Sequence, residues 1–535
     1  MSRLNQNPLV EVPFNNFGGG YAGAKGASTL KSNEAQDLDN IVILPNGSGF
    51  RNRQGNKELD TNNFTAMNVY TDVVGLGTFK GSSEYLIWAV INSSDDIVVF
   101  DTVIGSGSGG LRVTMTGTFD QDDLITFFNF DDKVIGVGAR QSPIYVTPGT
   151  SGTTLGGSPP AGNFGFAWNN RAWIGSTSAN PSKLSYSILN DPEDWSSSGA
   201  GFVEPSAGDG DEITAAAPIS NNVLLLFKKR TVYQVVGRSD PFAVFPLFND
   251  TGCVGKHALV ATEGLVYFIT PDGEMKITDG AKIYDNKDIP ALSSADDLWN
   301  QVPKSRLPYI TGFRQTGDSF DWIVWMVSLG ASQASNNYAI IWDLVNKCWL
   351  KCSTGYNGNA ATKDSNGNHY IGGYDYGRVN QLDYTDWYVD DSQGTPTYDG
   401  SNKQVAPTDS PPVRWFWRSD DMSVDSLQNI LQVQRLNILT NFENIGVLRV
   451  SYGYDGIHDQ DSKLIDTGSD TFILGTSILG TGILGADKFQ TKTIRPLGRG
   501  QTLNIKLAGS SDVKSTISKY TLAGSQKGVK DQQVR

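Results

Sequence analysis

The sequence is poor in the residues that build disulfide frameworks, metal sites and catalytic triads. Its 535 residues include three histidines and three cysteines, Cys253, Cys348 and Cys352. An odd, sparse set of thiols in a long chain does not form a disulfide framework, and it favours folding in a reducing compartment. Cys348 and Cys352 are four residues apart, but no second Cys or His pair completes a zinc site. We therefore predict no metal site and no cofactor.

Long apolar runs are also missing. The opening residues, MSRLNQNPLVEVPFNN, contain no apolar stretch of signal-peptide length. No run approaches the roughly 20 apolar residues that span a bilayer. We therefore expect a soluble protein with no secretion signal of its own.

Positive charge is in deficit. The chain has 43 Lys and Arg against 56 Asp and Glu, which gives a net charge of −13. Tight binding of nucleic acid through its phosphates needs clustered Lys and Arg, so the composition disfavours that function. An acidic surface is suited to DNA that must slide past without sticking. This second point is a hypothesis.

Hydrolase motifs are missing as well. His257, His369 and His458 lie in neither a G-x-S-x-G nor an H-E-x-x-H setting, and nothing supports a Ser-His-Asp triad. We predict no catalytic residue and no enzymatic activity. Carboxylate pairs are numerous, but most fall in turns, where Asp commonly bonds its own backbone. The pairs are Asp95/Asp96, Asp122/Asp123, Asp131/Asp132, Glu193/Asp194, Asp209/Asp211 and Asp390/Asp391. Propeller glycosidases bring carboxylates together at a central channel, so a glycan-cleaving protein is the main enzymatic alternative.

Two acidic stretches that are rich in Gly or Asn could be taken for cation sites, but each has a simpler interpretation as a turn or loop. Asp364, Asn366 and Asn368 have a D-x-N-x-N spacing that could place oxygens around Ca²⁺. The distal acidic ligand of an EF-hand is missing, so we predict a hairpin turn. The GDGDE run at 208–212 is most simply a solvated loop.

The sequence is rich in a repeated pair of apolar strands. The first strands of the pairs begin at Tyr85, Val134, Ala172, Val223, Leu265, Trp322 and Tyr370, so the repeat spans 38 to 57 residues. Partner strands follow after Asn, Gly or Pro turns, such as Asn169-Asn170 and Asn366-Gly367, which suit tight hairpins. A repeat of about this length that contains only strands is typical of β-propeller blades. We predict an all-β fold with a β-propeller of six blades, if one pair belongs to a neighbouring domain, or of seven.

The repeats divide the chain into four parts. Residues 1–65 are polar and Gly-rich, and they predict an N-terminal arm and a hairpin that pack with the C-terminal platform. Residues 66–384 contain the propeller. Residues 385–412 are polar and Pro-rich and predict a long loop. Residues 413–535 alternate apolar and polar positions and predict an antiparallel β-sandwich.

A loop at 472–489 interrupts the sandwich and contains Ile-Leu-Gly three times at five-residue spacing. A five-residue step matches neither the face of a strand nor that of a helix. Either the apolar side chains pack against the sandwich, or they form a docking loop that buries them against a partner. The candidate interface residues are Ile473, Leu474, Ile478, Leu479, Ile483, Leu484 and Phe489.

Four segments occur in an order that is found in one known family. Asn33–Asn56 contains NEA and L-x-N before a hairpin that ends in Arg-x-Gly, and Lys183–Ser197 contains L-x-Y-S followed by D-P-E-D-W. Phe320–Cys352 has a strand, a polar turn and a strand ending in Asp before a Trp. Gly498–Gly524 contains two predicted strands in which apolar and polar residues alternate. Together they resemble the tail-hub or nozzle proteins of short-tailed double-stranded DNA phages, also called packaged-DNA stabilization proteins.

The resemblance implies a structural role in the virion tail. Six copies would form a homohexameric ring below the portal and its head-tail adaptor. The ring would extend and close the DNA channel, retain the genome, pass it at ejection without sequence-specific binding, and dock tail fibres or spikes. The protein would be made and assembled in the bacterial cytoplasm. The family offers no catalytic residues to transfer, and the alternative is a glycan-binding or glycan-hydrolysing propeller of a tail.

Overall fold

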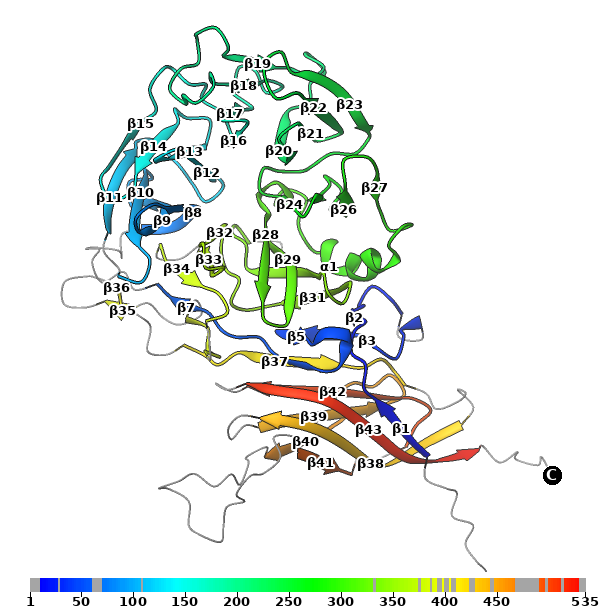
Figure 1. Cartoon of the computed structure of the whole chain (residues 1–535). Helices are drawn as coiled ribbons and strands as arrows, with labels where there is room; N and C mark the ends of the chain where they lie inside the picture. The colour runs from blue at the N-terminus through cyan, green and yellow to red at the C-terminus, as the bar shows by residue number, and fades with distance from the viewer. Residues whose placement is uncertain are drawn as a thin grey trace, which may run out of the picture.

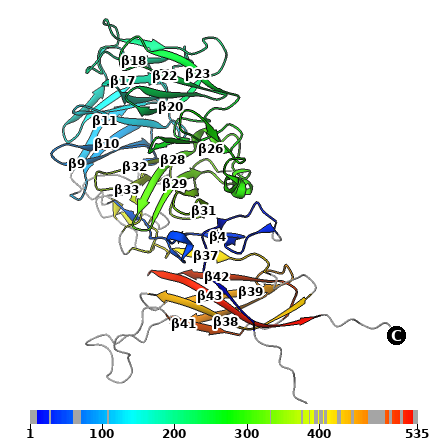
Figure 2. The same ribbon diagram turned by 45° about the vertical axis from the view of Figure 1, so that its right-hand side comes forward.

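The computed structural model describes most of the chain between residues 10 and 528. The described residues are 10–26, 29–59, 70–106, 109–330, 333–373, 377–384, 387–391, 397–398, 404–405, 410–422, 429–442, 447–466, 490–495, 499–510 and 514–528. They form a propeller stacked on a smaller sandwich, with N-terminal strands between the two (Figures 1 and 2).

Within the described residues, seven sets of four antiparallel strands form the propeller. The first three blades are β8 (Tyr70–Lys80), β9 (Glu84–Asn92), β10 (Ile97–Val103), β11 (Gly109–Met115); β12 (Ile125–Phe130), β13 (Lys133–Gly138), β14 (Ile144–Thr147), β15 (Ser151–Thr154); and β16 (Phe164–Trp168), β17 (Arg171–Gly175), β18 (Leu184–Tyr186), β19 (Gly201–Val203). The fourth and fifth are β20 (Ile213–Ser220), β21 (Val223–Lys228), β22 (Thr231–Val236), β23 (Ala243–Asn249); and β24 (Leu259–Thr262), β25 (Leu265–Ile269), β26 (Met275–Thr278), β27 (Ile283–Tyr284). The sixth and seventh are β28 (Thr311–Gly317), β29 (Phe320–Val327), β30 (Tyr338–Asp343), β31 (Cys348–Cys352); and β32 (Ala360–Lys363), β33 (His369–Gly372), β34 (Val379–Gln381), β7 (Lys57–Glu58).

The all-β propeller predicted from the sequence is confirmed, and the number of blades is seven. All seven apolar strand pairs seen in the sequence are the two central strands of a blade, which are the most deeply buried. The pattern did not include the innermost strands, which are interrupted by Gly75 and Gly77 in β8, or the short polar outer strands such as Ser151–Thr154. Innermost strands β8, β12 and β16 contact one another in turn, and β32 contacts β8 to close the ring.

The ring is closed by a strand that comes from outside the repeats. The outer strand of the seventh blade is β7, which pairs with β34 through Lys57 and Glu58. The sequence assigned these residues to the N-terminal arm, because two residues carry no repeat signal. A second N-terminal strand, β2 (Gly20–Tyr21), extends the sixth blade beside β31 and is followed by β3 (Glu34–Ala35).

The sandwich consists of two sheets that draw strands from both chain ends. One sheet has the order β41 (Gln490–Ile494), β38 (Asn429–Phe442), β43 (Ser515–Gly528), β6 (Phe50–Asn52), β5 (Ile41–Ile43), with β1 (Val10–Phe14) also on β43. The other has the order β4 (Asp37–Asp39), β37 (Arg414–Arg418), β42 (Leu503–Ser510), β39 (Val447–Tyr454), β40 (Asp461–Asp466). The N-terminal segment therefore contains a hairpin, β5 and β6, that packs with the C-terminal strands as predicted, and its other strands belong to the sandwich and to two blades where the sequence predicted an arm.

The remaining elements are short. They are the 3₁₀ turns η2 (Pro45–Gly47), η4 (Pro290–Ala295) and η5 (Leu307–Tyr309), the helix α1 (Asp296–Trp299), and the hairpin β35 (Thr397–Tyr398) with β36 (Gln404–Val405). No helix of the described residues has the length and apolarity needed to cross a membrane.

Aromatic side chains dominate both cores. In the propeller, six tryptophans of the strands are fully buried: Trp88, Trp173, Trp322, Trp325, Trp342 and Trp349. In the sandwich, Phe17 and Phe50 from the N-terminal segment pack on Trp417, with ring centroids 5.4 and 6.1 Å away. Because large aromatics supply most of the burial energy of a core, the sandwich core depends on residues from both chain ends.

Candidate functional site

Arg53 lies at the junction of the propeller and the sandwich, one residue after β6. Its side chain is 1% exposed and forms a two-pronged ion pair with Asp390, in which Nη1 donates to Oδ1 at 2.9 Å and Nη2 donates to Oδ2. The remaining donors go to Thr354 (carbonyl oxygen, 2.8 Å), Asn40 (Oδ1, 3.1 Å) and Gln54 (carbonyl oxygen, 2.9 Å). The whole guanidinium is thus bonded, as a buried cation requires.

The Arg53 contacts join segments that are far apart in the sequence. Arg53 precedes the propeller, Thr354 follows its sixth blade, and Asp390 lies beyond its seventh. Burial alone would lower the pKa of Arg53, but the carboxylate of Asp390 reverses this effect and raises it. The cation is therefore permanent, and it fixes the two ends of the ring to one another.

Gly55 completes the Arg-x-Gly motif at the end of the predicted N-terminal hairpin. A Cβ at Gly55 would lie 1.9 Å from the carbonyl oxygen of Val389, so no other residue fits without movement. The Gly55 amide donates to the carbonyl of Trp387 at 2.6 Å. The motif therefore has a physical basis, because the Arg binds the segment after the propeller and the Gly allows that segment to approach.

The seventh blade is held at the same place by a cluster around Asp391. The Asp391 carboxylate accepts the backbone N–H of Glu58 at 2.9 Å and the hydroxyl of Ser410 at 2.7 Å, and its carbonyl accepts from Arg378 at 3.0 Å. Glu58 is 6% exposed. Burial raises the pKa of Glu58 to about 8, Asp391 adds to the rise, and Arg378 opposes it. Glu58 is therefore largely protonated at neutral pH.

These contacts show that part of the predicted 385–412 loop is a packed segment. Asp390 and Asp391 are 1% and 2% exposed. Val389 forms a bridge with Pro412, and Asp390 forms one with Asn56. The polar composition that predicted a loop instead provides side chains for buried ion pairs and hydrogen bonds.

The mouth of the propeller channel is a second candidate site, a cavity of about 390 Å³ lined by loops of five blades. Lys256, in the loop before β24, reaches across to the loops before β12 and β16. Its Nζ donates to the carbonyl oxygen of Leu124, and to the carbonyl oxygen and Oδ1 of Asn163 at 2.9 and 3.1 Å. Burial lowers the pKa of Lys256 to about 7, with Asp123 opposing and Arg140 adding to the decrease. Lys256 faces the channel and is only half-buried by surface area, yet other atoms surround its ammonium.

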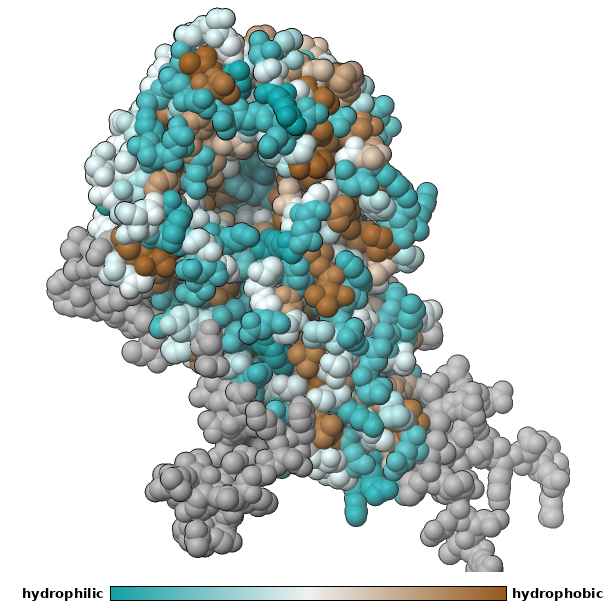
Figure 3. All heavy atoms as spheres, in the orientation of Figure 1, coloured by the Kyte–Doolittle hydropathy of each residue, from teal (hydrophilic) through white to brown (hydrophobic). Residues whose placement is uncertain are grey.

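Ion pairs also cross the mouth. Arg306, before the sixth blade, pairs with Asp122, before the second, at 2.8 Å. Arg140 of the second blade pairs with Glu212, before the fourth, at 2.8 Å, and Lys229 pairs with the same carboxylate at 2.7 Å. Contacts that span the ring stiffen it and occupy the mouth of its channel with side chains. Figure 3 shows the hollow at the ring centre from one side.

The carboxylates at this mouth are the feature that a propeller hydrolase requires. Asp122, Asp123 and Glu212 come from the second and fourth blades, so carboxylates of different blades do converge. Burial raises the pKa of both Asp122 and Asp123, although Arg306 opposes the rise at Asp122. Asp122 and Glu212 are engaged by Arg and Lys, and Asp123 accepts the backbone N–H of Asp120 at 3.0 Å. The arrangement therefore consists of ion-paired and hydrogen-bonded carboxylates.

The other predicted polar features are turns. Asp364 Oδ1 accepts the backbone N–H groups of Asn366 and Asn368 at 2.9 and 2.8 Å, so the D-x-N-x-N segment forms a hairpin turn as predicted. In the GDGDE run, Asp209 pairs with the buried Lys228 at 2.7 Å. Among the described residues, no group of three or more His, Cys, Asp or Glu is arranged to hold a metal.

The cysteines and two of the histidines are embedded in the fold. Cys253, Cys348 and Cys352 are buried and unpaired thiols. Burial lowers the pKa of His257 to about 3 and that of His369 to about 4, so both are neutral at neutral pH.

The predicted interface residues lie outside the described residues. These are Ile473, Leu474, Ile478, Leu479, Ile483, Leu484 and Phe489, and the described chain stops at 466 and resumes at 490. The proposed docking role of this loop therefore stays a prediction. Arg53 and Lys256 were missed in the sequence, because a single Arg or Lys has no local pattern, although Arg53 belongs to the Arg-x-Gly motif.

Comparisons with known proteins bear on the fold alone. No family model and no curated protein matches the chain. Solved structures that match include the WD40 β-propeller domain of Doa1, at 12% identity over 62% of this chain and 98% of that one, with a TM-score of 0.38. BamB from Moraxella catarrhalis matches at 12% identity over 64% and 96%, with a TM-score of 0.37. YCF48 bound to D1 peptide matches at 11% over 62% and 100%, with a TM-score of 0.38. At these values the propeller assignment rests on the sheets themselves.

Proposed function

We propose that this chain is a structural subunit of the tail nozzle of a short-tailed double-stranded DNA phage. Six copies would form a ring below the portal and its adaptor, continue the DNA channel, retain the genome and pass it at ejection. The proposal starts from the resemblance of four sequence segments to that family. The fold adds a physical argument, because such a ring must carry load without deforming.

The Arg53–Asp390 ion pair is the observation that supports this proposal most. A single buried guanidinium holds the N-terminal strands, the sixth blade and the segment after the propeller. Propeller and sandwich are thereby joined by bonds rather than by a free linker, so force on one part is transmitted to the other. A monomeric binding propeller has no comparable need for a rigid second domain.

The channel of the propeller itself is a poor path for DNA. Lys256 and the pair Arg306–Asp122 span its mouth. We therefore place the DNA on the axis shared by the six copies. The propeller residues 66–384 contain 33 Asp and Glu against 21 Lys and Arg, and an acidic wall would repel the DNA backbone. We expect acidic side chains to dominate the wall of that shared channel, and a wall of mainly Lys and Arg would overturn this part.

The copy number of this chain in purified phage particles tests the proposal. Quantitative mass spectrometry should give a ratio near one to two against a twelve-copy portal protein. Absence from particles, or a number set by fibres, would refute the nozzle role. Deletion of the segment 472–489 should leave the chain folded but reduce ring or adaptor assembly, if this loop docks as proposed.

The convergent carboxylates at the channel mouth favour one alternative, a propeller that binds or cleaves glycans. Asp122 and Asp123 have raised pKa values, as a general acid needs. Under this alternative, Asp122→Asn and Asp123→Asn would abolish the release of reducing ends from host polysaccharide. Under the nozzle proposal, the wild-type chain releases none.

A further inference from the structure

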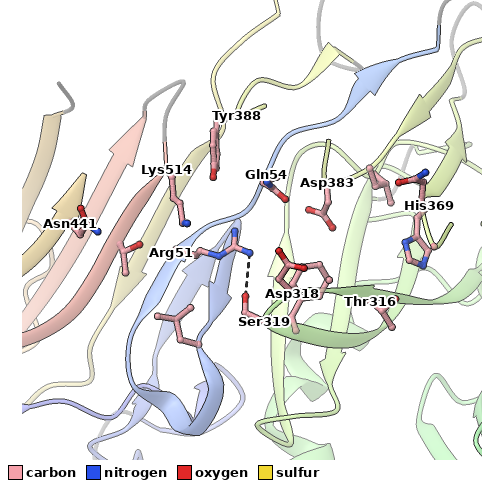
Figure 4. A pocket seen from close by; sticks show the side chains of 17 residues that line it. Arg51, Gln54, Thr316, Asp318, Ser319, His369, Asp383, Tyr388, Asn441 and Lys514 are labelled. Atoms are coloured by element: carbon pink, nitrogen blue, oxygen red, sulfur yellow. Dashed lines mark hydrogen bonds between the residues drawn. The ribbon is translucent and has the colours of Figure 1, made fainter. Parts of the chain in front are cut away.

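A cavity of about 520 Å³ lies between the propeller and the sandwich. Its walls come from β6, from the turns that follow β28 and β34, and from residues that flank β43 (Figure 4). It is separate from the channel mouth and is not used in the proposed function. The labelled side chains around it are polar, so the cavity suits a polar occupant.

Arg51 is the buried charge of this cavity. Its side chain comes from β6, is 8% exposed, and points into the cavity (Figure 4). It forms two long hydrogen bonds, from Nη1 to the carbonyl of Asn52 at 3.2 Å and from Nη2 to Ser319 Oγ at 3.3 Å. No Asp or Glu of the described residues forms an ion pair with it. Arg53, two residues along the chain, has a carboxylate and a full set of acceptors.

A buried guanidinium with five N–H donors normally has an anionic partner, because its desolvation is otherwise uncompensated. The two carboxylates that line the cavity, those of Asp318 and Asp383, do not form an ion pair with Arg51. Asp318 is exposed and can be hydrated, and Asp383 accepts a hydrogen bond from the side-chain amide of Gln315. Neither carboxylate forms an ion pair with Arg51, although the charge of Arg51 opposes the rise in the pKa of Asp383, and Arg51 keeps donors that face the cavity.

We propose that this cavity binds an oxyanion, a phosphate or a carboxylate group, with Arg51 as its principal ligand. The planar fork of Arg51 can hold two oxygens of such a group at once. Lys514 lies on the same wall and adds positive charge, and Gln54 and Asn441 offer neutral amide donors (Figure 4). A bound oxyanion would contact groups of the N-terminal strand, the sixth blade and the sandwich together, and would brace the junction.

The surrounding charges predict the pH dependence of binding. The titratable or charged groups that line the cavity are Arg51, Lys514, Asp318, Asp383, His369 and Tyr388. Burial raises the pKa of Asp383 to about 6, with Arg51 opposing, so this carboxylate loses its charge as the pH falls through that value. His369 stays neutral, because its pKa is lowered to about 4. An anion whose own charge is constant, such as sulfate, should therefore bind more tightly at pH 5 than at pH 7.

The test is calorimetric titration of the full-length chain at neutral pH with sodium phosphate and, separately, sodium acetate, each against sodium chloride of equal ionic strength. Saturable binding of phosphate assigns the site to phosphate groups, and saturable binding of acetate assigns it to carboxylates. Binding of either should raise the melting temperature in proportion to its occupancy. Absence of saturable binding for both ions overturns the proposal.

Variants assign the binding to Arg51. Arg51→Gln should weaken binding by about 10- to 100-fold, the range for loss of charge-assisted hydrogen bonds. The matched control is Arg238→Gln, which removes the same charge from an exposed position on the fourth blade and should leave binding unchanged. If Arg51→Gln does not fold, Asp318→Asn still tests the site, because removal of an exposed competing carboxylate should tighten binding. Unchanged binding in Arg51→Gln, or in Asp318→Asn, would refute the assignment to this cavity.

Discussion

The propeller and the sandwich are both built from antiparallel strands, but they take these strands from the chain in opposite ways. The propeller uses consecutive residues, and each blade packs against the next one in the sequence. Among the described strands, β7 completes the seventh blade from outside the repeats, and β2 and β3 add to the edge of the sixth. The sandwich joins strands from residues 10–52 to strands from residues 414–528, so the pairings of β43 with β1 and with β6, and of β37 with β4, each close a very long loop. Their charges differ too, since the propeller is acidic and residues 413–535 have 15 Lys and Arg against 12 Asp and Glu.

Because of this difference, we expect the propeller, but not the C-terminal sandwich strands, to fold as a separate chain. A ring of sequential blades satisfies its sheet edges locally and leaves short protected edges outside. A sandwich lacking its N-terminal strands exposes buried aromatics and an unpaired edge. The junction between them, at Arg53 and Glu58, determines whether the two parts unfold together.

The largest expected effect comes from separating the two parts. A chain of residues 53–391 retains all seven blades with β7 and the Arg53–Asp390 pair, and we expect it to fold. A chain of residues 413–535 lacks β1, β4, β5 and β6, and we expect it to aggregate or remain unfolded. Circular dichroism and hydrogen exchange measure both outcomes. A folded, monomeric 413–535 chain would show that the N-terminal strands are accessory.

The next largest effect is expected at Arg53. Arg53→Ala leaves Asp390 buried without a partner, and we expect a loss of about 3–5 kcal/mol in the free energy of unfolding. The double variant Arg53→Met with Asp390→Leu should recover most of this loss, because no charge is then left unpaired. Urea unfolding of the three chains measures the difference. A cost below about 1 kcal/mol for Arg53→Ala would mean that the junction does not depend on this pair.

A smaller effect is expected at Gly55. Gly55→Ala forces a methyl group against the carbonyl of Val389, and overpacking of this kind costs about 1–3 kcal/mol. Gly110→Ala is the matched control, because a Cβ there meets nothing closer than 3.9 Å. Thermal unfolding measures the effect: we expect a lower melting temperature for Gly55→Ala and a nearly unchanged one for Gly110→Ala. Equal effects would show that Gly55 is not needed for the close approach.

The smallest expected change in the free energy of unfolding, taken per pH unit, comes from the titration of Glu58. Its pKa is raised to about 8 in the folded chain, from an unfolded value near 4.3. The folded chain therefore holds a proton that the unfolded chain has lost between about pH 5 and pH 8, so stability falls as the pH rises. The slope contributed by this group is at most about 1.4 kcal/mol per pH unit. Glu58→Gln should flatten the stability profile in this window, and an unchanged profile would contradict the assignment.

The sequence predicted much of the propeller and little of the junction. All seven central strand pairs were visible, because deeply buried strands must be apolar and Gly or Asn must occupy their turns. The innermost strand β8 contains Gly75 and Gly77, and Cβ atoms at these positions would press on Ile125 and Phe127 of the next blade. Because of these glycines, β8 lacks the apolar pattern of a central strand. Segment 385–412 was assigned to a loop, because buried polar residues such as Asp390 are indistinguishable from solvated ones in a sequence.

The fold class, the repeat and the order of the two regions could all be predicted from the amino-acid sequence. Buried strands that recur at a regular interval produce a regular apolar pattern in the sequence. The residues that form a tight turn are adjacent, so their types can be recognised directly. The three-dimensional fold was needed to show that β7 closes the ring, that N-terminal strands enter both sheets of the sandwich, and that Arg53 and Asp390 meet. These pairings join residues separated by about 300 positions or more, and a contact between distant single residues has no period or spacing that could announce it.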